Sequence, residues 1–114
     1  MAAKIAHYVL TLTGAVQQLS SVLPALTGGL KAGAYDYPCT FLTLQPGGGN
    51  ANPLYVGDDN AITSSDYGFR LEAATAGVPP APFVFDPGVG NVKVGDLFVL
   101  GTNGEKLHLL LVSA

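Results

Sequence analysis

Few residues in this 114-residue sequence are of types that perform chemistry. A catalytic zinc or iron site needs about three clustered histidine or carboxylate ligands. The chain has only two histidines, His7 and His108, which lie at opposite ends of the sequence. They can meet if the terminal strands pair, but a polar residue on a solvated strand face explains each histidine more simply. A metal-dependent enzyme, including a cupin-type dioxygenase, is therefore disfavoured.

Motifs for nucleophilic catalysis and nucleotide binding are missing as well. No serine lies in a glycine-serine-glycine elbow, and the single cysteine, Cys39, has no neighbouring base in the sequence. The tract Gly47-Gly48-Gly49 is not followed by Lys-Ser or Lys-Thr, so it indicates a loop and not a phosphate cradle. One cysteine excludes an intramolecular disulfide and fits a small buried apolar residue in a reducing compartment. We predict no catalytic, cofactor-binding or metal-binding residues.

The carboxylates Asp58, Asp59 and Asp66 are the one acidic group that is close along the chain. Paired carboxylates cleave glycosides, and several oxygens together bind calcium. The spacing does not fit an EF-hand loop, and acidic residues in such segments are usually solvated turn residues. Calcium and solvated turns both remain interpretations of this segment.

Composition narrows the class of protein. The length predicts one domain, residues 1–114. Only 11% of residues are charged and 48% are hydrophobic, so a partner is expected to cover part of the surface. A net charge of −3 argues against nucleic acid, and no apolar stretch approaches the roughly 20 residues of a membrane-spanning helix. The N-terminal segment lacks a cleavage site and is interpreted as mature protein.

Fifteen glycines and eight prolines separate short apolar segments, a pattern typical of β-sandwiches. The segment Ala15–Leu26 is the one place where the apolar spacing suits a helical turn, although an irregular crossover fits equally. Loops are predicted over Gly28–Tyr37, Pro46–Pro53 and Ala73–Pro82. We expect strands over Tyr8–Thr13, Cys39–Gln45, Leu54–Gly57, Tyr67–Glu72, Phe83–Phe85, Asp96–Thr102 and Glu105–Ser113.

The last two segments flank Asn103-Gly104, the dipeptide typical of a type I′ turn, and so predict a C-terminal β-hairpin. In it, Leu97 and Val99 should pack with Leu107, Leu109 and Leu111. The long apolar last strand is expected to be central or to meet another chain. The predicted fold class is all-β: an antiparallel sandwich, jelly-roll-like, with little or no helix, and other Greek-key sandwiches remain open.

Four segments carry a resemblance to a known class of proteins. They are Leu-Thr-Gly-Ala-Val-Gln-Gln-Leu-Ser from residue 12, Asn-Pro-Leu-Tyr-Val-Gly from residue 52, Tyr-Gly-Phe-Arg-Leu from residue 67 and Leu-Phe-Val-Leu-Gly-Thr-Asn-Gly-Glu-Lys-Leu from residue 97. Together they resemble small virion structural proteins of tailed bacteriophages. The resemblance implies a capsid decoration (cement) protein, a small sandwich or jelly roll that sits on the outer shell as a trimer and clamps neighbouring major capsid subunits. It would be made in the bacterial cytoplasm and reside on the virion surface.

The physical character of the chain agrees with such a role, since several weak contacts on a symmetric lattice combine through multivalency. The candidate interface residues are Tyr35, Tyr37, Tyr55, Tyr67, Leu109 and Leu111. Tyrosine suits an interface because it buries a large area at low entropic cost, although ordinary core positions are an equal explanation. The N-terminal residues Met1–His7 and the loop Gly28–Tyr37 are expected to dock onto the shell.

Two alternatives share the same fold. One is another virion role, at the head–tail junction, the tail or a fibre. The other is an adhesion module that stacks host glycans on Tyr35, Tyr37 or Tyr67, a hypothesis that the absence of tryptophan disfavours.

Overall fold

The computed structural model describes residues 5–19, 38–75, 78–86 and 92–113. These residues form β-strands joined by turns and one 3-10 turn, η1 (Val94–Asp96). The expected all-β class is confirmed, and every strand pair is antiparallel. In the described residues, no helix is long and apolar enough to cross a membrane.

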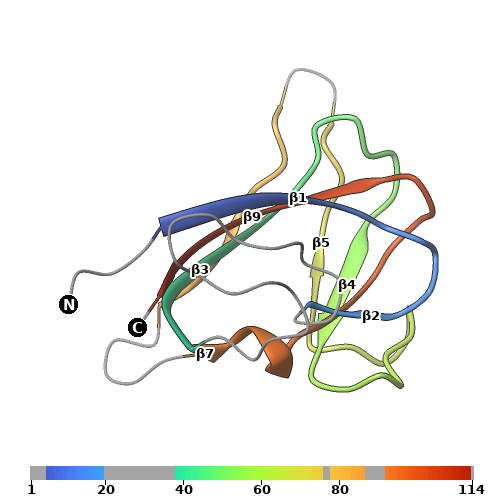
Figure 1. The fold of residues 1–114 in the computed structure, drawn as a ribbon. Coiled ribbons are helices and arrows are strands. Elements are labelled where there is room, and N and C mark those ends of the chain that lie inside the picture. Colours follow the sequence, from blue (N-terminus) through green and yellow to red (C-terminus); the bar gives the residue numbers. More distant parts are fainter. Residues whose placement is uncertain (1–4, 20–37, 76–77, 87–91, 114) are drawn as a thin grey trace.

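The first sheet is built around the long C-terminal strand. Its strand order is β1-β9-β3-β6, and the short β7 also pairs with β3. Figure 1 shows β1, β9 and β3 running side by side as one layer. The bounds are β1 Ile5–Thr11, β3 Pro38–Pro46, β6 Phe83–Phe85, β7 Val92–Lys93 and β9 Lys106–Ser113.

The second sheet has the order β2-β8-β4-β5 and forms the other layer in Figure 1. Its strands are shorter than the main strands of the first sheet. The bounds are β2 Gln17–Gln18, β4 Leu54–Gly57, β5 Phe69–Leu71 and β8 Phe98–Leu100.

One hydrophobic core lies between the two sheets. Strand β9 shows why: Leu107, Leu109 and Leu111 are buried, whereas His108 and Leu110 between them are exposed, because successive side chains of a strand point to opposite faces. Each large apolar side chain that leaves water contributes about 1.5–3 kcal/mol. The second sheet supplies Leu54, Val56, Leu71 and Val99 to the same cluster.

Most predicted strands are confirmed, with small changes in their ends. Strand β4 has the predicted bounds, β3 extends the predicted strand by one residue at each end, and β6 is the expected edge strand. Of the predicted helical turn over Ala15–Leu26, residues 15–19 are described, and Gln17–Gln18 form strand β2. The remainder lies outside the described residues.

The prediction of a C-terminal hairpin is wrong. Strands β8 and β9 belong to different sheets: β8 pairs with β2 and β4, while β9 pairs with β1 and β3. A turn does form, since Glu105 N donates to Thr102 O (3.1 Å) and Gly104 has a φ of 87°. Gly104 N then donates to Leu12 O (2.8 Å), so the chain crosses between sheets instead of folding back on β8. Both strands are central, which leaves neither edge of β9 for β8.

The glycine-rich segment between β3 and β4 is a loop, as predicted, but Asn50 within it is buried. The side chain of Asn50 is 6% exposed and pairs with the backbone at the start of β9. Its Nδ2 donates to Lys106 O (2.8 Å), and Lys106 N donates to its Oδ1 (2.9 Å). Asn50 thus replaces a strand partner at this position and fixes the loop to the sheet.

Candidate functional site

The solvent-facing side of the first sheet is the first candidate site. We call it the outward face. Strand register arranges its residues in four rows across β1, β9, β3 and β6. From one end to the other, the rows are Ile5–Val112–Phe41, His7–Leu110–Thr43–Val84, Val9–His108–Gln45 and Thr11–Lys106.

The outward face changes character along the strands. Its first row consists of apolar residues only, and the last row is polar, with Lys106 Nζ donating to Thr11 Oγ1 (2.6 Å). Its apolar side chains are open to solvent: Ile5 is 70% exposed, Val9 52%, Val84 45% and Leu110 41%. A group of exposed β-branched and aliphatic side chains on one sheet face is a feature of interaction surfaces.

The two histidines lie on this face, because the terminal strands pair as the sequence analysis allowed. His7 and His108 line one shallow hollow together with Thr43 and Gln45. Gln45 Nε2 donates to Pro80 O (2.8 Å). Among the described residues, no group of three or more histidine, cysteine, aspartate or glutamate side chains is placed to hold a metal ion.

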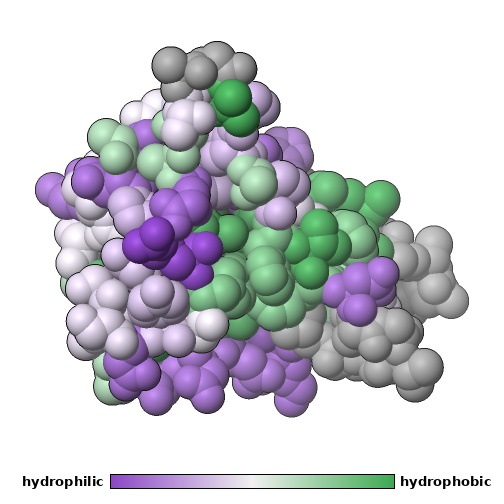
Figure 2. Space-filling view, turned by 180° about the vertical axis from the view of Figure 1, so that it is seen from behind, coloured by the Kyte–Doolittle hydropathy of each residue, from purple (hydrophilic) through white to green (hydrophobic). Residues whose placement is uncertain are grey.

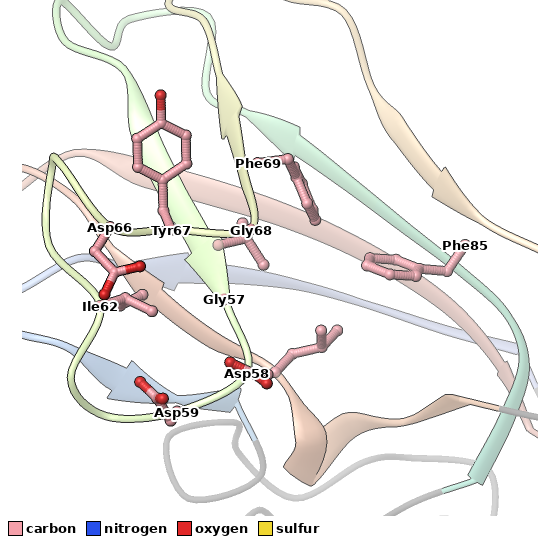
Figure 3. Close-up of a pocket in the computed structure, with 11 residues that line it drawn as sticks. Gly57, Asp58, Asp59, Ile62, Asp66, Tyr67, Gly68, Phe69 and Phe85 are labelled. Carbon is pink, nitrogen blue, oxygen red and sulfur yellow. The ribbon is translucent and has the colours of Figure 1, made fainter.

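The second candidate site is a cleft of about 350 Å³ between the two sheets at the ends of β4 and β5. We call it the acidic cleft. Figure 3 shows Phe69 and Phe85 at one end, and the carboxylates of Asp58, Asp59 and Asp66 around the loop at the other. The complete lining is Val56, Gly57, Asp58, Asp59, Ile62, Asp66, Tyr67, Gly68, Phe69, Phe85 and Leu97.

The loop geometry explains how the aspartates come together. Thr63 N donates to Asp66 O (2.9 Å), and Asp66 N donates to Thr63 Oγ1 (3.0 Å), so residues 63–66 form a closed turn. Asp59 Oδ1 accepts a hydrogen bond from Ala61 N (2.9 Å). Beneath the turn, Ile62 is 6% exposed and supplies an apolar floor. The predicted solvated turn is therefore also the rim of a cavity.

An aromatic cluster adjoins the cleft at the free edges of both sheets. The rings of Phe69 and Phe83 stack with centroids 4.0 Å apart, and Phe85 packs against Phe83 at 4.9 Å. This edge faces the viewer in Figure 2, where hydrophobic atoms gather in the middle and strongly hydrophilic atoms lie beside them. The three rings are only partly buried, so the core opens to solvent here.

The structure separates the candidate interface residues. Tyr55 lies on β4 and Tyr67 in the segment just before β5, and their rings contact each other with centroids 4.9 Å apart. Neither residue belongs to the outward face. Tyr67 lines the acidic cleft and is 40% exposed. Tyr35 and Tyr37, like the rest of the loop Gly28–Tyr37, lie outside the described residues.

Leu109 and Leu111 are placed in the core, 2% and 0% exposed, so a partner does not reach them. The apolar run of β9 does present leucine to solvent, but at Leu110. Alternation alone divides the run into two faces, and the strand register decides which face points outward. The outward-facing residues Leu110 and Val112 were missed because the run of four apolar residues from Leu109 to Val112 shows no alternation of its own.

Cys39 is fully buried on β3. Burial raises the pKa of its thiol from 9.0 to about 11, because the thiolate would lose its hydration. The thiol is therefore protonated at neutral pH, as expected for a structural cysteine and not for a nucleophile.

No protein-family model matches this chain, and no curated protein matches its sequence.

Proposed function

We propose that this protein is a structural component of a tailed-bacteriophage virion, a decoration protein that binds the outer surface of the major capsid shell and stabilises it. The observation that carries the proposal is the outward face, where three strands place Ile5, Val112 and Phe41 in one solvent-facing row. A chain with so few charges and such a face is suited to lie against another protein.

The proposed fold is a jelly roll. The strand order supports it, since first pairs with last and the pairing nests inward: β1 with β9, β2 with β8, β3 with β6 and β4 with β5. Successive pairs alternate between the two sheets, as in one long hairpin rolled into two layers. This topology is common in shell proteins, but the fold alone does not identify a function.

The outward face has the properties of a surface for repeated weak contacts. Its apolar end would bury side chains that are 41–70% exposed in the isolated chain, and its polar end offers His108, Gln45 and Lys106 for hydrogen bonds at the rim. On a symmetric shell, subunits joined as the proposed homotrimer would engage several such contacts at once, which raises the effective affinity without any single strong contact.

Purified protein mixed with empty heads that lack it tests the proposal. After gradient separation, we expect bound copies to saturate at a multiple that matches the shell symmetry, and the decorated heads to withstand a higher temperature. Binding of a few copies at one vertex would favour a head–tail or tail role, and no binding would contradict a virion shell role.

The oligomeric state is measured separately by sedimentation equilibrium. The proposal expects a mass of three chains, each of 11.7 kDa. A single-chain mass across the whole concentration range would contradict the homotrimer.

A further inference from the structure

The acidic cleft combines two features that one kind of ligand satisfies together. Its floor and one wall are apolar, formed by Val56, Ile62, Phe69, Phe85 and Leu97. Its rim carries the three carboxylates of Asp58, Asp59 and Asp66. A ligand that complements it has an apolar stem and a cationic head.

The negative charge of the rim is not balanced within the described residues. Among the residues that the structure describes, no lysine, arginine or histidine lines the cleft. The nearby Arg70, on β5, forms an ion pair with Glu72. Within the described part of the chain, the carboxylates of Asp58 and Asp66 make no hydrogen bond or ion pair, and that of Asp59 accepts only the backbone bond from Ala61. A cation in the cleft would reduce the mutual repulsion of these three charges.

The carboxylates of the rim distinguish between the two basic side chains. A guanidinium group is planar and forms paired hydrogen bonds with carboxylates. An ammonium group is strongly hydrated and acts as a point charge. Phe69 and Phe85 lie at one end of the cleft and the carboxylates at the other, as Figure 3 shows, and an extended side chain with a flat cationic head spans both.

We propose that the acidic cleft binds an arginine side chain of a partner protein, with the aliphatic stem against Ile62 and Phe85 and the guanidinium group between Asp58 and Asp66. The partner is a different protein and not a second copy, because the only arginine of this chain, Arg70, is already paired with Glu72. The acidic cleft shares no lining residue with the outward face, so the proposed arginine site does not rest on the proposed function. That function only suggests that a capsid subunit supplies the arginine.

The test uses the intact protein and the tripeptide acetyl-Gly-Arg-Gly-amide as the probe, followed by amide chemical shifts in NMR. Citrulline in place of arginine is the uncharged control of equal shape, and lysine is the control for charge alone. We expect weak, saturable binding on the order of millimolar, with shifts confined to residues 56–69 and residues 85 and 97. Citrulline should produce no saturable shift, and lysine should bind at least about threefold more weakly.

Single variants locate the contact. Asp58→Asn and Asp66→Asn should each weaken arginine binding by about threefold or more. Glu105→Gln, which removes a carboxylate outside the cleft and leaves the Arg70–Glu72 ion pair intact, should leave the affinity unchanged. Equal binding of lysine and arginine, shifts scattered over the surface, or insensitivity to both aspartate variants would overturn the proposal. So would cleft shifts that depend on protein concentration without probe, which indicate a second copy, or cleft shifts produced by neutral sugars and not by arginine.

The result of the arginine-probe experiment does not depend on whether the protein binds heads. The probe experiment contains no capsid, so a protein that ignores heads can still bind arginine, and a protein that decorates heads can fail to bind it.

Discussion

At the scale of single residues, Gly101 shows how closely the core is packed. A Cβ atom at this position would collide with Leu12 Cδ1 and lie 3.3 Å from Leu54 Cβ, and both leucines are about 1% exposed. We expect Gly101→Ala to lower the free energy of unfolding by about 1–3 kcal/mol, because the surrounding core has little room to relax. Urea denaturation measures this change.

The matched control is Gly48→Ala. A Cβ atom at Gly48 has no neighbour within 4 Å, so the same substitution should change the free energy of unfolding by no more than about 0.5 kcal/mol. Equal effects at the two glycines would show that the packing around Gly101 is looser than described here.

Cys39 provides a second prediction at this scale. Its thiol has a pKa raised to about 11 by burial, whereas the unfolded chain titrates near 9.0. Between these values the unfolded state has lost the thiol proton and the folded state has kept it, so stability falls as the pH rises from 9 to 11. The expected loss is about 2 kcal/mol.

Urea denaturation at pH 8, 9, 10 and 11 measures this loss, and Cys39→Ala is the comparison, because it should lack that part of the pH dependence. Labelling with a thiol reagent at pH 7.5 gives an independent result: slow in the folded protein and fast in urea. Rapid, complete labelling of the folded protein would contradict the burial of Cys39.

At the scale of elements, strand β9 joins the core and the outward face. Leu109 is 2% exposed and Leu110 is 41% exposed, although they are adjacent and chemically identical. We expect Leu109→Ala to cost about 2–5 kcal/mol of stability and Leu110→Ala no more than about 1 kcal/mol. Thermal or urea denaturation of the two variants gives both values, and a reversed order would mean that the strand register is shifted by one residue.

The strands were easier to predict than their partners. Alternation in Leu54–Gly57 and the apolar run from Cys39 depend on nearby residues, so the sequence predicted both strands nearly to the residue. The turn at Asn103-Gly104 was also predicted, but its strands were assigned to one hairpin. In the structure, β1 and β3 occupy both edges of β9 and leave no edge for β8. The residues of the turn could not predict this pairing, because β1 and β3 come from distant parts of the chain.

The candidate sites depend even more on long-range contacts. The possible meeting of His7 and His108 was predictable, since terminal strands often pair. The row Ile5–Val112–Phe41 was not, because it requires the register of three strands. The acidic turn was recognised from the sequence, but its apolar wall was not, because Phe85 reaches it from the other sheet.

At the scale of the whole molecule, the composition predicted exposed apolar surface, and the structure contains it. The sequence has few charges and a mean hydropathy of +0.37, which suggested a covered surface. The outward face and the open aromatic edge are where the described residues expose apolar side chains in groups. The proposed virion role assigns the first surface to the shell, and the acidic cleft beside the second to a partner's arginine.

The proposed shell-binding role of the outward face can be tested by binding of outward-face variants to empty heads. Ile5→Thr, Val9→Thr and Leu110→Thr, combined in one protein, keep good strand-forming residues while removing exposed apolar surface. Val78→Thr, at a residue 58% exposed outside the outward face, is the control. We expect the triple variant to stay folded and to lose at least about tenfold in affinity for heads, while Val78→Thr binds like the original protein. Unchanged binding by a folded triple variant, or no binding by the original protein, would contradict that role.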